Sequence, residues 1–273
     1  MEKRHTNLYI GRWLNMRKYF NVIHRVFSLS FQQFLYNRAD FLMWMAVSVG
    51  WTLFTIVFYL AIFSQTTSIS GWSQREMMVF LGVYMLIDTF TWNFFYSNMM
   101  KFATSIHSGS FDYVLMKPID PQFFVSFQYV GVSNILRAVI GVALIVMNLD
   151  AFSSGALLLS SIFFVIALIF QYCFWIMSAC LAFYFERMQN SVEIVAAMRR
   201  FWSMPSDIYR GLLSAILTII IPFALITTIP AKILIGKTWL EHLIPFLLAT
   251  VFFFMLARFI FIRSIKRYSG AGS

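Results

Sequence analysis

Six long stretches of mainly apolar residues follow one another along this chain and leave little sequence for anything else. A helix needs about 20 such residues to cross the hydrocarbon core of a bilayer. Uninterrupted apolar runs indicate helices, because the strands of a membrane β-barrel alternate apolar and polar residues. The six expected spans cover residues 41–63, 77–97, 127–147, 156–185, 211–229 and 243–262. The sequence therefore predicts an all-α polytopic membrane protein.

The composition excludes several other classes of protein. Hydrophobic residues make up 60% of the 273 residues and charged residues only 12%, whereas a soluble domain carries about a quarter of charged residues. An ordinary soluble enzyme, a disordered chain and a disulfide-stapled secreted domain are excluded on this ground. We expect an N-terminal segment, 1–40, and one six-helix transmembrane domain, 41–273.

The chain has a net charge of +10, from 21 Lys and Arg against 11 Asp and Glu. Such an excess can indicate nucleic-acid binding, an anionic membrane surface or a topology signal. Seventeen of the basic residues fall on one side of the expected spans and three on the other, with Arg137 inside a span. Because Lys and Arg concentrate in cytoplasmic loops, both termini are expected in the cytoplasm and no nucleic-acid partner is expected.

The N-terminal segment has the pattern of an amphipathic helix. Apolar residues recur at steps of three and four, which places them on one helix face. These residues are Met16, Phe20, Ile23, Phe27, Phe31 and Phe34. With basic residues nearby, the pattern predicts a helix lying in the cytoplasmic membrane interface and contacting lipids. A helix packed on a partner protein is the alternative, and the two are compatible.

The loop between the second and third expected spans, 98–126, has a regular pattern. It predicts a short helix, a break at Gly109 and a second amphipathic piece that ends at Pro118. Phe111, Leu115 and Ile119 could present one apolar ridge. A rigid, ridged loop suits a membrane protein that receives force from a soluble partner. The alternative is a structured connector without a partner.

Two charged residues lie inside expected spans. Asp88 and Arg137 both fall near the bilayer midplane at about 1.5 Å of helix rise per residue. Each is costly in contact with lipid, so we hypothesise that both face the bundle interior and pair. They could line a substrate path or form a gate. A structural ion pair and different span boundaries are the alternatives. Gln171 is a lesser candidate of the same kind.

Five short motifs occur in order along the chain. They are GWS (71–73), GSFDYVLMKPIDP (109–121), MPSDIY (204–209), IPFA with IPA and LIG (221–236) and RYSGAGS (267–273). In order and spacing they resemble the bacterial permease subunits of type-2 ABC transporters, over nearly the whole chain. The closest subgroup is the six-span permeases encoded beside a second, related permease and an ATPase. His107 and Ser108 depart from the charged residues that usually precede the family's glycine.

The resemblance implies the fold of type-2 ABC exporters: an N-terminal interfacial helix, six spans and a cytoplasmic coupling helix. By position the coupling helix covers about 106–115. The resemblance implies that the residues of this region that contact the ATPase are Ile106, His107, Gly109, Phe111, Asp112, Leu115, Lys117 and Pro118. A re-entrant external segment is expected at about 229–242. Pro222 and Pro230 interrupt this region, which is too long for one helix and poorly shaped for two.

The resemblance also implies the function. The chain is expected to be the permease of an exporter of a hydrophobic or amphipathic substrate in the bacterial inner membrane. Its partners are two copies of an ABC ATPase, a second permease, identical or paralogous, and membrane lipids. The sequence has no phosphate-binding loop, so ATP and Mg²⁺ are expected on the ATPase, and no catalytic or metal site on this chain. The alternatives are an ion-coupled carrier or channel and a non-transporting assembly subunit.

Overall fold

The computed structural model describes residues 16–149, 153–185, 191–237 and 240–268, and most of them are helical. The first half contains α2 (Met16–Tyr36), α3 (Arg38–Phe63), β1 (Ser68–Ile69), β2 (Trp72–Ser73), α4 (Gln74–Phe90), a π-helical turn (Thr91–Tyr96), α5 (Ser97–His107), α6 (Phe111–Leu115), α7 (Pro121–Ser126) and α8 (Ile135–Asn148). The second half contains α9 (Ser154–Cys180), a 3-10 turn (Leu181–Phe183), α10 (Ser191–Met198), 3-10 turns (Arg199–Phe201 and Ser206–Ile208), α11 (Gly211–Ala215), a π-helical turn (Ile216–Ile220), α12 (Leu225–Leu234), a 3-10 turn (Leu240–His242) and α13 (Leu243–Ile265).

Four of these helices are long and apolar enough to cross a membrane. They are α3, the continuous 34-residue helix Gln74–His107 that joins α4 to α5, Ser154–Phe183 and α13. A bent helix pair makes a fifth candidate if it counts as one span. These helices agree with the expected all-α polytopic class. Residues 1–15 of the expected N-terminal segment, 238–239 of the expected re-entrant segment and 269–273 of the last motif lie outside the described residues.

The third expected span is not one continuous helix. Residues 127–134 are non-helical, and α8 has 14 residues. At 1.5 Å per residue α8 is about 21 Å long, which is less than the thickness of the hydrocarbon core. Asn98 Nδ2 donates to the Tyr129 carbonyl at 2.8 Å, and the Gly131 N–H donates to the Asn93 carbonyl at 2.8 Å. These bonds satisfy backbone groups that a helix normally pairs internally.

The fifth expected span, 211–229, is wrong as a single helix. Helices Gly211–Ile220 and Leu225–Leu234 meet at 82°. Ile221 is extended, with φ −129° and ψ 84°, because a following proline disfavours helical backbone. Pro222 therefore lies at the break. Pro230 lies inside α12, which begins at Leu225 and not near residue 229.

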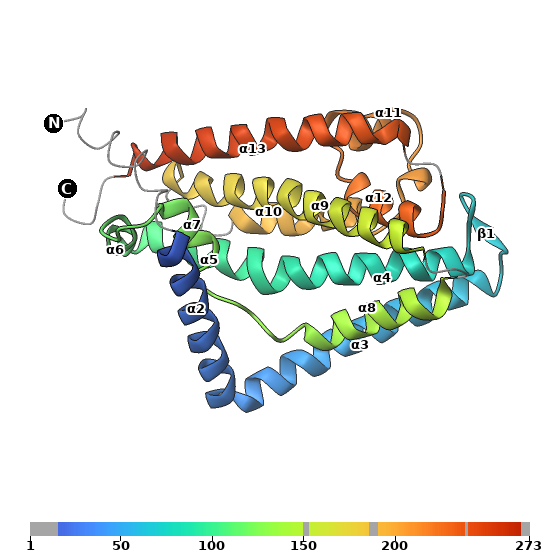
Figure 1. Cartoon of the computed structure of the whole chain (residues 1–273), viewed down its shortest axis with the longest axis horizontal. Coiled ribbons are helices and arrows are strands. Elements are labelled where there is room, and N and C mark those ends of the chain that lie inside the picture. The colour runs from blue at the N-terminus through green and yellow to red at the C-terminus, as the bar shows by residue number, and fades with distance from the viewer. Residues whose placement is uncertain (1–15, 150–152, 186–190, 238–239, 269–273) are drawn as a thin grey trace.

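The bundle has two distinct ends along its long axis (Figure 1). At one end the Tyr268 hydroxyl, just beyond α13, donates to the Gly109 carbonyl at 3.0 Å beside α6. At the other end β1 and β2 form an antiparallel hairpin that turns at Gly71, whose φ is +82°. Positive φ is readily adopted by glycine. We call these the α6 end and the hairpin end.

Residues 191–208 run from the α6 end toward the hairpin end. Along this segment Glu193 accepts a hydrogen bond from the Tyr96 hydroxyl at 2.6 Å, and Arg199 contacts Asp88. Further on, Asp207 accepts a hydrogen bond at 2.9 Å from Nε1 of Trp72, which lies in the hairpin. The segment therefore packs along most of the α4–α5 helix. This differs from the expected spans 156–185 and 211–229, which left Arg199 in a loop on the same side as α6.

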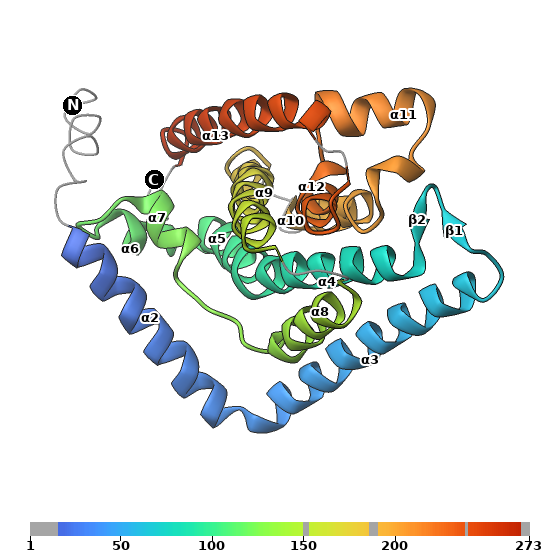
Figure 2. The ribbon, with the colours of Figure 1, turned by 45° about the vertical axis from the view of Figure 1, so that its right-hand side comes forward.

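Helix α4 lies at the centre of the bundle, with α8 on one side and α9 and α12 on the other (Figure 2). Two glycines let α4 and α8 approach closely. A Cβ atom on Gly82 would lie 2.5 Å from the Gly141 carbonyl oxygen, and one on Gly141 would lie 2.9 Å from the Gly82 carbonyl oxygen. Small residues at such crossings bring helix backbones together in membrane proteins. This contact positions α8 for the site described next.

Candidate functional site

A cluster of three charged side chains lies inside the bundle. Asp88 is fully buried, and Arg137 Nη1 lies 2.7 Å from its Oδ2 atom. Arg199 Nη1 lies 3.3 Å from both Oδ1 and Oδ2 of the same carboxylate and donates to both. The structure thus brings together the two charged residues singled out in the expected spans. It adds Arg199 as a third member.

The three residues come from separate elements. Asp88 lies on α4, and the glycine contact between α4 and α8 brings Arg137 beside it. Arg199 begins the 3-10 turn that follows α10. An aromatic ring flanks each guanidinium: Arg137 lies 5.5 Å from the Tyr84 ring centre and Arg199 lies 5.4 Å from that of Trp92. Rings at this distance stabilise a cation through their negative faces.

The charges of this cluster do not balance. In the described part of the chain both arginines pair with Asp88 and with no second carboxylate, so the cluster carries one excess positive charge. Arg137 Nε is buried and has no hydrogen-bond partner among the described residues. The Arg137 side chain is 10% exposed and that of Arg199 is 35% exposed. The open side of the cluster is therefore at Arg199.

Arg199 was missed because two adjacent arginines look like part of a polar loop. The available signal was the apolar run VEIVAAM, residues 192–198, which immediately precedes it. It is too short for a span by length, but it forms most of α10. Its buried residues Val192 and Val195 pack inside the bundle. A short apolar helix that ends in Arg can therefore carry that charge into the interior.

Gln171 does not join the charged cluster. Its Oε1 atom accepts a hydrogen bond from Thr91 Oγ1 at 2.8 Å, which ties α9 to the first residue of the π-helical turn. This turn begins three residues after Asp88 and separates it from α5. π-Helical turns inside α-helices are frequent at functional sites. Gln171 therefore anchors the segment between the charged cluster and the α6 end.

The expected coupling helix, 106–115, consists of two pieces. Helix α5 ends at His107, and α6 begins at Phe111. Between them Gly109 adopts a φ of +73°, which permits the reversal of the chain. Asp120 caps α7 through the Phe123 N–H at 3.1 Å and pairs with Arg258 of α13 at 2.8 Å. The C-terminal part of the loop is thus held to α13.

Phe111 anchors α6 to the bundle. Its buried ring lies 5.5 Å from Phe102, 5.6 Å from Phe183 and 5.2 Å from Tyr268, measured between ring centres. Partial burial, together with the nearby Asp112 carboxylate, raises the pKa of the Tyr268 hydroxyl. Aromatic contacts of this kind stabilise beyond the area that they bury. The position of α6 is therefore fixed relative to α5 and α13.

The apolar ridge expected from Phe111, Leu115 and Ile119 is wrong, because Phe111 and Ile119 are buried. The large exposed hydrophobic side chains of this loop are Tyr113 and Met116, each 69% exposed. Amphipathic spacing identified two faces but not which of them packs on the bundle.

The other residues of the expected coupling set differ in exposure. Ile106 is buried, and Pro118 is exposed. His107, Gly109, Asp112, Leu115 and Lys117 are partly exposed. Lys117 Nζ lies 3.5 Å from the centre of the Phe124 ring, and partial burial lowers the pKa of its ammonium group.

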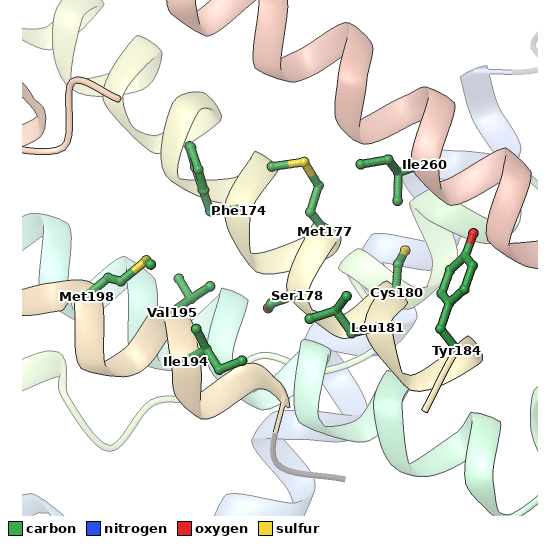
Figure 3. A pocket seen from close by; sticks show the side chains of 10 residues that line it. All are labelled: Phe174, Met177, Ser178, Cys180, Leu181, Tyr184, Ile194, Val195, Met198 and Ile260. Carbon is green, nitrogen blue, oxygen red and sulfur yellow. The ribbon is translucent and has the colours of Figure 1, made fainter. Parts of the chain in front are cut away.

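An apolar pocket of 260 Å³ lies where α9, α10 and α13 meet (Figure 3). Figure 3 shows Met198 and Val195 on α10, Met177 on α9 and Ile260 on α13 around it. The described residues contain no group of three or more His, Cys, Asp or Glu that could hold a metal ion. The lining of the pocket is almost wholly apolar.

A family model described as "ABC-2 family transporter protein" matches residues 49–272, which is most of the chain. The chain therefore belongs to this family. No curated protein and no solved structure matches it. The family and the apolar helices together make the chain a multi-pass membrane protein and an ABC transporter permease, which works with an ATPase partner.

Proposed function

We propose that this chain is the permease subunit of an ATP-driven exporter, on which a separate ATPase docks at α6. The observation that carries the proposal is the 34-residue helix Gln74–His107. It connects the docking loop to the buried charged cluster without an interruption of the helix, apart from its π-helical turn. A displacement of α6 is therefore transmitted along α5 to Asp88.

The surface of α6 supports a protein partner. Tyr113 on α6 and Met116 directly after it are exposed apolar residues, and the buried Phe111 holds this helix in place. Aromatic residues and Met are enriched in protein interfaces. We propose that two ATPase copies, each carrying ATP and Mg²⁺, bind this loop on this chain and on a second permease, identical or paralogous. ATP binding and hydrolysis then move the two α6 loops together and apart.

The charged cluster lies between the two ends of the bundle, where a gate must act. We propose that movement of α4 changes how Arg137 and Arg199 share Asp88. Arg199 is the longer contact, at 3.3 Å against 2.7 Å, and the more exposed of the two. The π-helical turn next to Asp88 is a place where the helix can bend. Access to the path therefore alternates with this rearrangement.

We propose six membrane crossings, in which residues 127–148 form the third and residues 191–208 the fifth. Residues 211–234 then form a re-entrant helix pair at the hairpin end, on the external side. Six crossings place both termini at the α6 end, which is cytoplasmic in a bacterial inner membrane. In this topology Arg199 and Arg200 lie within a crossing and Arg210 lies on the external side. Fourteen of the seventeen basic residues then remain on the cytoplasmic side, and four basic residues, including Arg210, lie on the external side. The positive-inside bias therefore persists.

Lipids and an apolar substrate fit the remaining surfaces. Helix α2 exposes Phe20, Phe27 and Phe31, which suits a helix at the membrane interface. The apolar pocket between α9, α10 and α13 supports a hydrophobic or amphipathic substrate (Figure 3). Its residue Met177 has a flexible side chain of a type that adapts to irregular apolar ligands.

Co-purification from native membranes tests this proposal. The tagged chain is extracted from its host membranes, and the proteins bound to it are identified by mass spectrometry. We expect an ABC ATPase with the wild-type chain, and its loss in the double variant Tyr113→Ala with Met116→Ala. The matched control is Leu53→Ala with Val57→Ala on the exposed face of α3. The absence of any ATPase with the wild-type chain would overturn the proposal.

A further inference from the structure

We propose that the cluster of Asp88, Arg137 and Arg199 binds one anionic group, a carboxylate or a phosphate, and that Arg199 is its contact residue. This inference rests on the proposed permease function and names the charge of the substrate that the path accepts. The chemistry that recognises this group is a guanidinium in a largely buried, aromatic setting.

The first step is the charge of the cluster. Two guanidiniums share the single carboxylate of Asp88, and the ion pairs of the described residues supply no second anion. A net charge at membrane depth is unfavourable unless it is neutralised or reaches water. An incoming anion neutralises this cluster, whereas a cation would add to the excess. The site is therefore selective for negative charge.

The second step is the number of free donors. Arginine has five N–H donors in a planar fork. Arg137 Nε is buried without a hydrogen-bond acceptor among the described residues, and the two hydrogen bonds of Arg199 to Asp88 both come from Nη1. The rest of the Arg199 fork remains for a ligand, on a side chain that is 35% exposed. Carboxylates and phosphates match such a fork in geometry.

The third step concerns the other groups that face the cluster. Tyr84 contributes its ring on the side of Arg137, and Trp92 contributes its ring on the side of Arg199. Glu193, the nearest acidic residue on α10, accepts a hydrogen bond from the Tyr96 hydroxyl at 2.6 Å. No ion pair between Glu193 and either arginine occurs in the described structure. The Arg199 side thus combines an available cation with a partly exposed aromatic ring.

Trp92 supplies a direct probe of this site because it lies beside Arg199. The full-length chain is reconstituted in phosphatidylcholine nanodiscs that contain brominated phosphatidylglycerol, whose bromine atoms quench nearby tryptophan. The Trp92→Phe variant isolates the signal of Trp92 from that of the other tryptophans. Brominated phosphatidylcholine is the zwitterionic control. We expect stronger quenching of Trp92 by the anionic lipid.

Two arms distinguish the source of the anion. In the first, inorganic phosphate is added to nanodiscs that contain brominated phosphatidylglycerol. Relief of the quenching by phosphate assigns the site to a free anion, and persistence of the quenching assigns it to the headgroup of an amphiphile. In the second arm, Arg199→Gln is compared with Arg200→Gln, which removes the same charge from the neighbouring exposed residue. We expect Arg199→Gln to weaken binding about tenfold and Arg200→Gln to leave it unchanged.

Equal quenching by the anionic and zwitterionic lipids in the wild-type chain would overturn the inference, and so would equal effects of the two arginine variants. If Arg199→Gln fails to fold, Arg199→Lys keeps the charge and replaces it in the second arm. Because lysine lacks the planar fork, Arg199→Lys is expected to weaken binding, and binding equal to that of the wild type in a folded Arg199→Lys chain would overturn the fork geometry. The assay needs no ATPase. Co-purification of an ATPase without selective quenching therefore rejects this inference alone.

Discussion

Arg199 lies 111 residues after Asp88 in the sequence, and its Nη1 atom lies 3.3 Å from both oxygens of that carboxylate. The contact fixes residues 191–208 near the middle of the continuous helix Gln74–His107. Since Arg137 of α8 binds the same carboxylate, three separate segments of the bundle meet at one acidic residue. The stability of the bundle and the proposed gate therefore depend on the same side chain.

Asp88→Asn is expected to destabilise the folded chain by about 3–5 kcal/mol, because it leaves the buried guanidinium of Arg137 and the partly exposed one of Arg199 without their carboxylate. Thermal unfolding of the purified protein in detergent measures this loss. Asp40→Asn, which changes an exposed carboxylate at the start of α3, is the control and should leave the transition in place. An unchanged transition for Asp88→Asn would contradict the role assigned to the cluster.

Gly82→Ala is expected to disrupt the packing of α4 on α8, because the new methyl group would lie 2.5 Å from the Gly141 carbonyl oxygen. The backbones must then separate, which also moves Arg137 away from Asp88. We expect a lower unfolding temperature and less folded protein by size-exclusion chromatography. Gly50→Ala on α3 has no atom within 4 Å of the added carbon, so it should behave like the wild-type chain. Equal behaviour of the two variants would refute this packing argument.

Phe111→Ala is expected to cost about 3–5 kcal/mol of stability, since it removes a fully buried aromatic ring. Met116→Ala on the same loop changes an exposed side chain and should stay within about 0.5 kcal/mol of the wild type. Chemical unfolding of the two variants in parallel gives the comparison. A larger loss from Met116→Ala would mean that the opposite face of α6 packs on the bundle.

The proposed crossing by residues 191–208 places residue 210 on the external side of the membrane. The chain has two cysteines, Cys173 and Cys180, and both are buried. Replacing both gives a cysteine-free background for labelling. In that background, Arg210→Cys should react with a membrane-impermeant maleimide in intact cells, and Ser108→Cys should react only after the cells are opened. Labelling of residue 210 only in opened cells would restore the topology with a fifth span at 211–229.

The long apolar helices could be predicted closely from the sequence. The expected spans 41–63, 156–185 and 243–262 lie within three residues of Arg38–Phe63, Ser154–Phe183 and Leu243–Ile265 at each end. Hydropathy succeeds there because each apolar run forms a helix that makes all of its backbone hydrogen bonds internally and exposes apolar side chains to lipid. Hydropathy did not place residues 191–208 against the bundle, because it counts the charge of Arg199 but not the distant carboxylate that pairs with it.

The candidate site was predictable only in part. Isolated charges in apolar runs singled out Asp88 and Arg137, since such residues are rarely left facing lipid. Arg199 stands beside Arg200 at the end of an apolar run that is too short for a span, and its sequence neighbours do not reveal its partner. Likewise, the orientation of α6 depends on Phe111 filling a space between α5 and α13. Helical spacing alone does not contain that information.

ATP hydrolysis by the purified complex in liposomes tests the central proposal most directly. The rate is measured for the ATPase alone, for the ATPase with this chain, and for the ATPase with the Tyr113→Ala and Met116→Ala double variant. If α6 couples the two proteins, the wild-type chain changes the rate, and the double variant returns it to that of the ATPase alone. A rate that is the same with and without the chain would contradict the proposal.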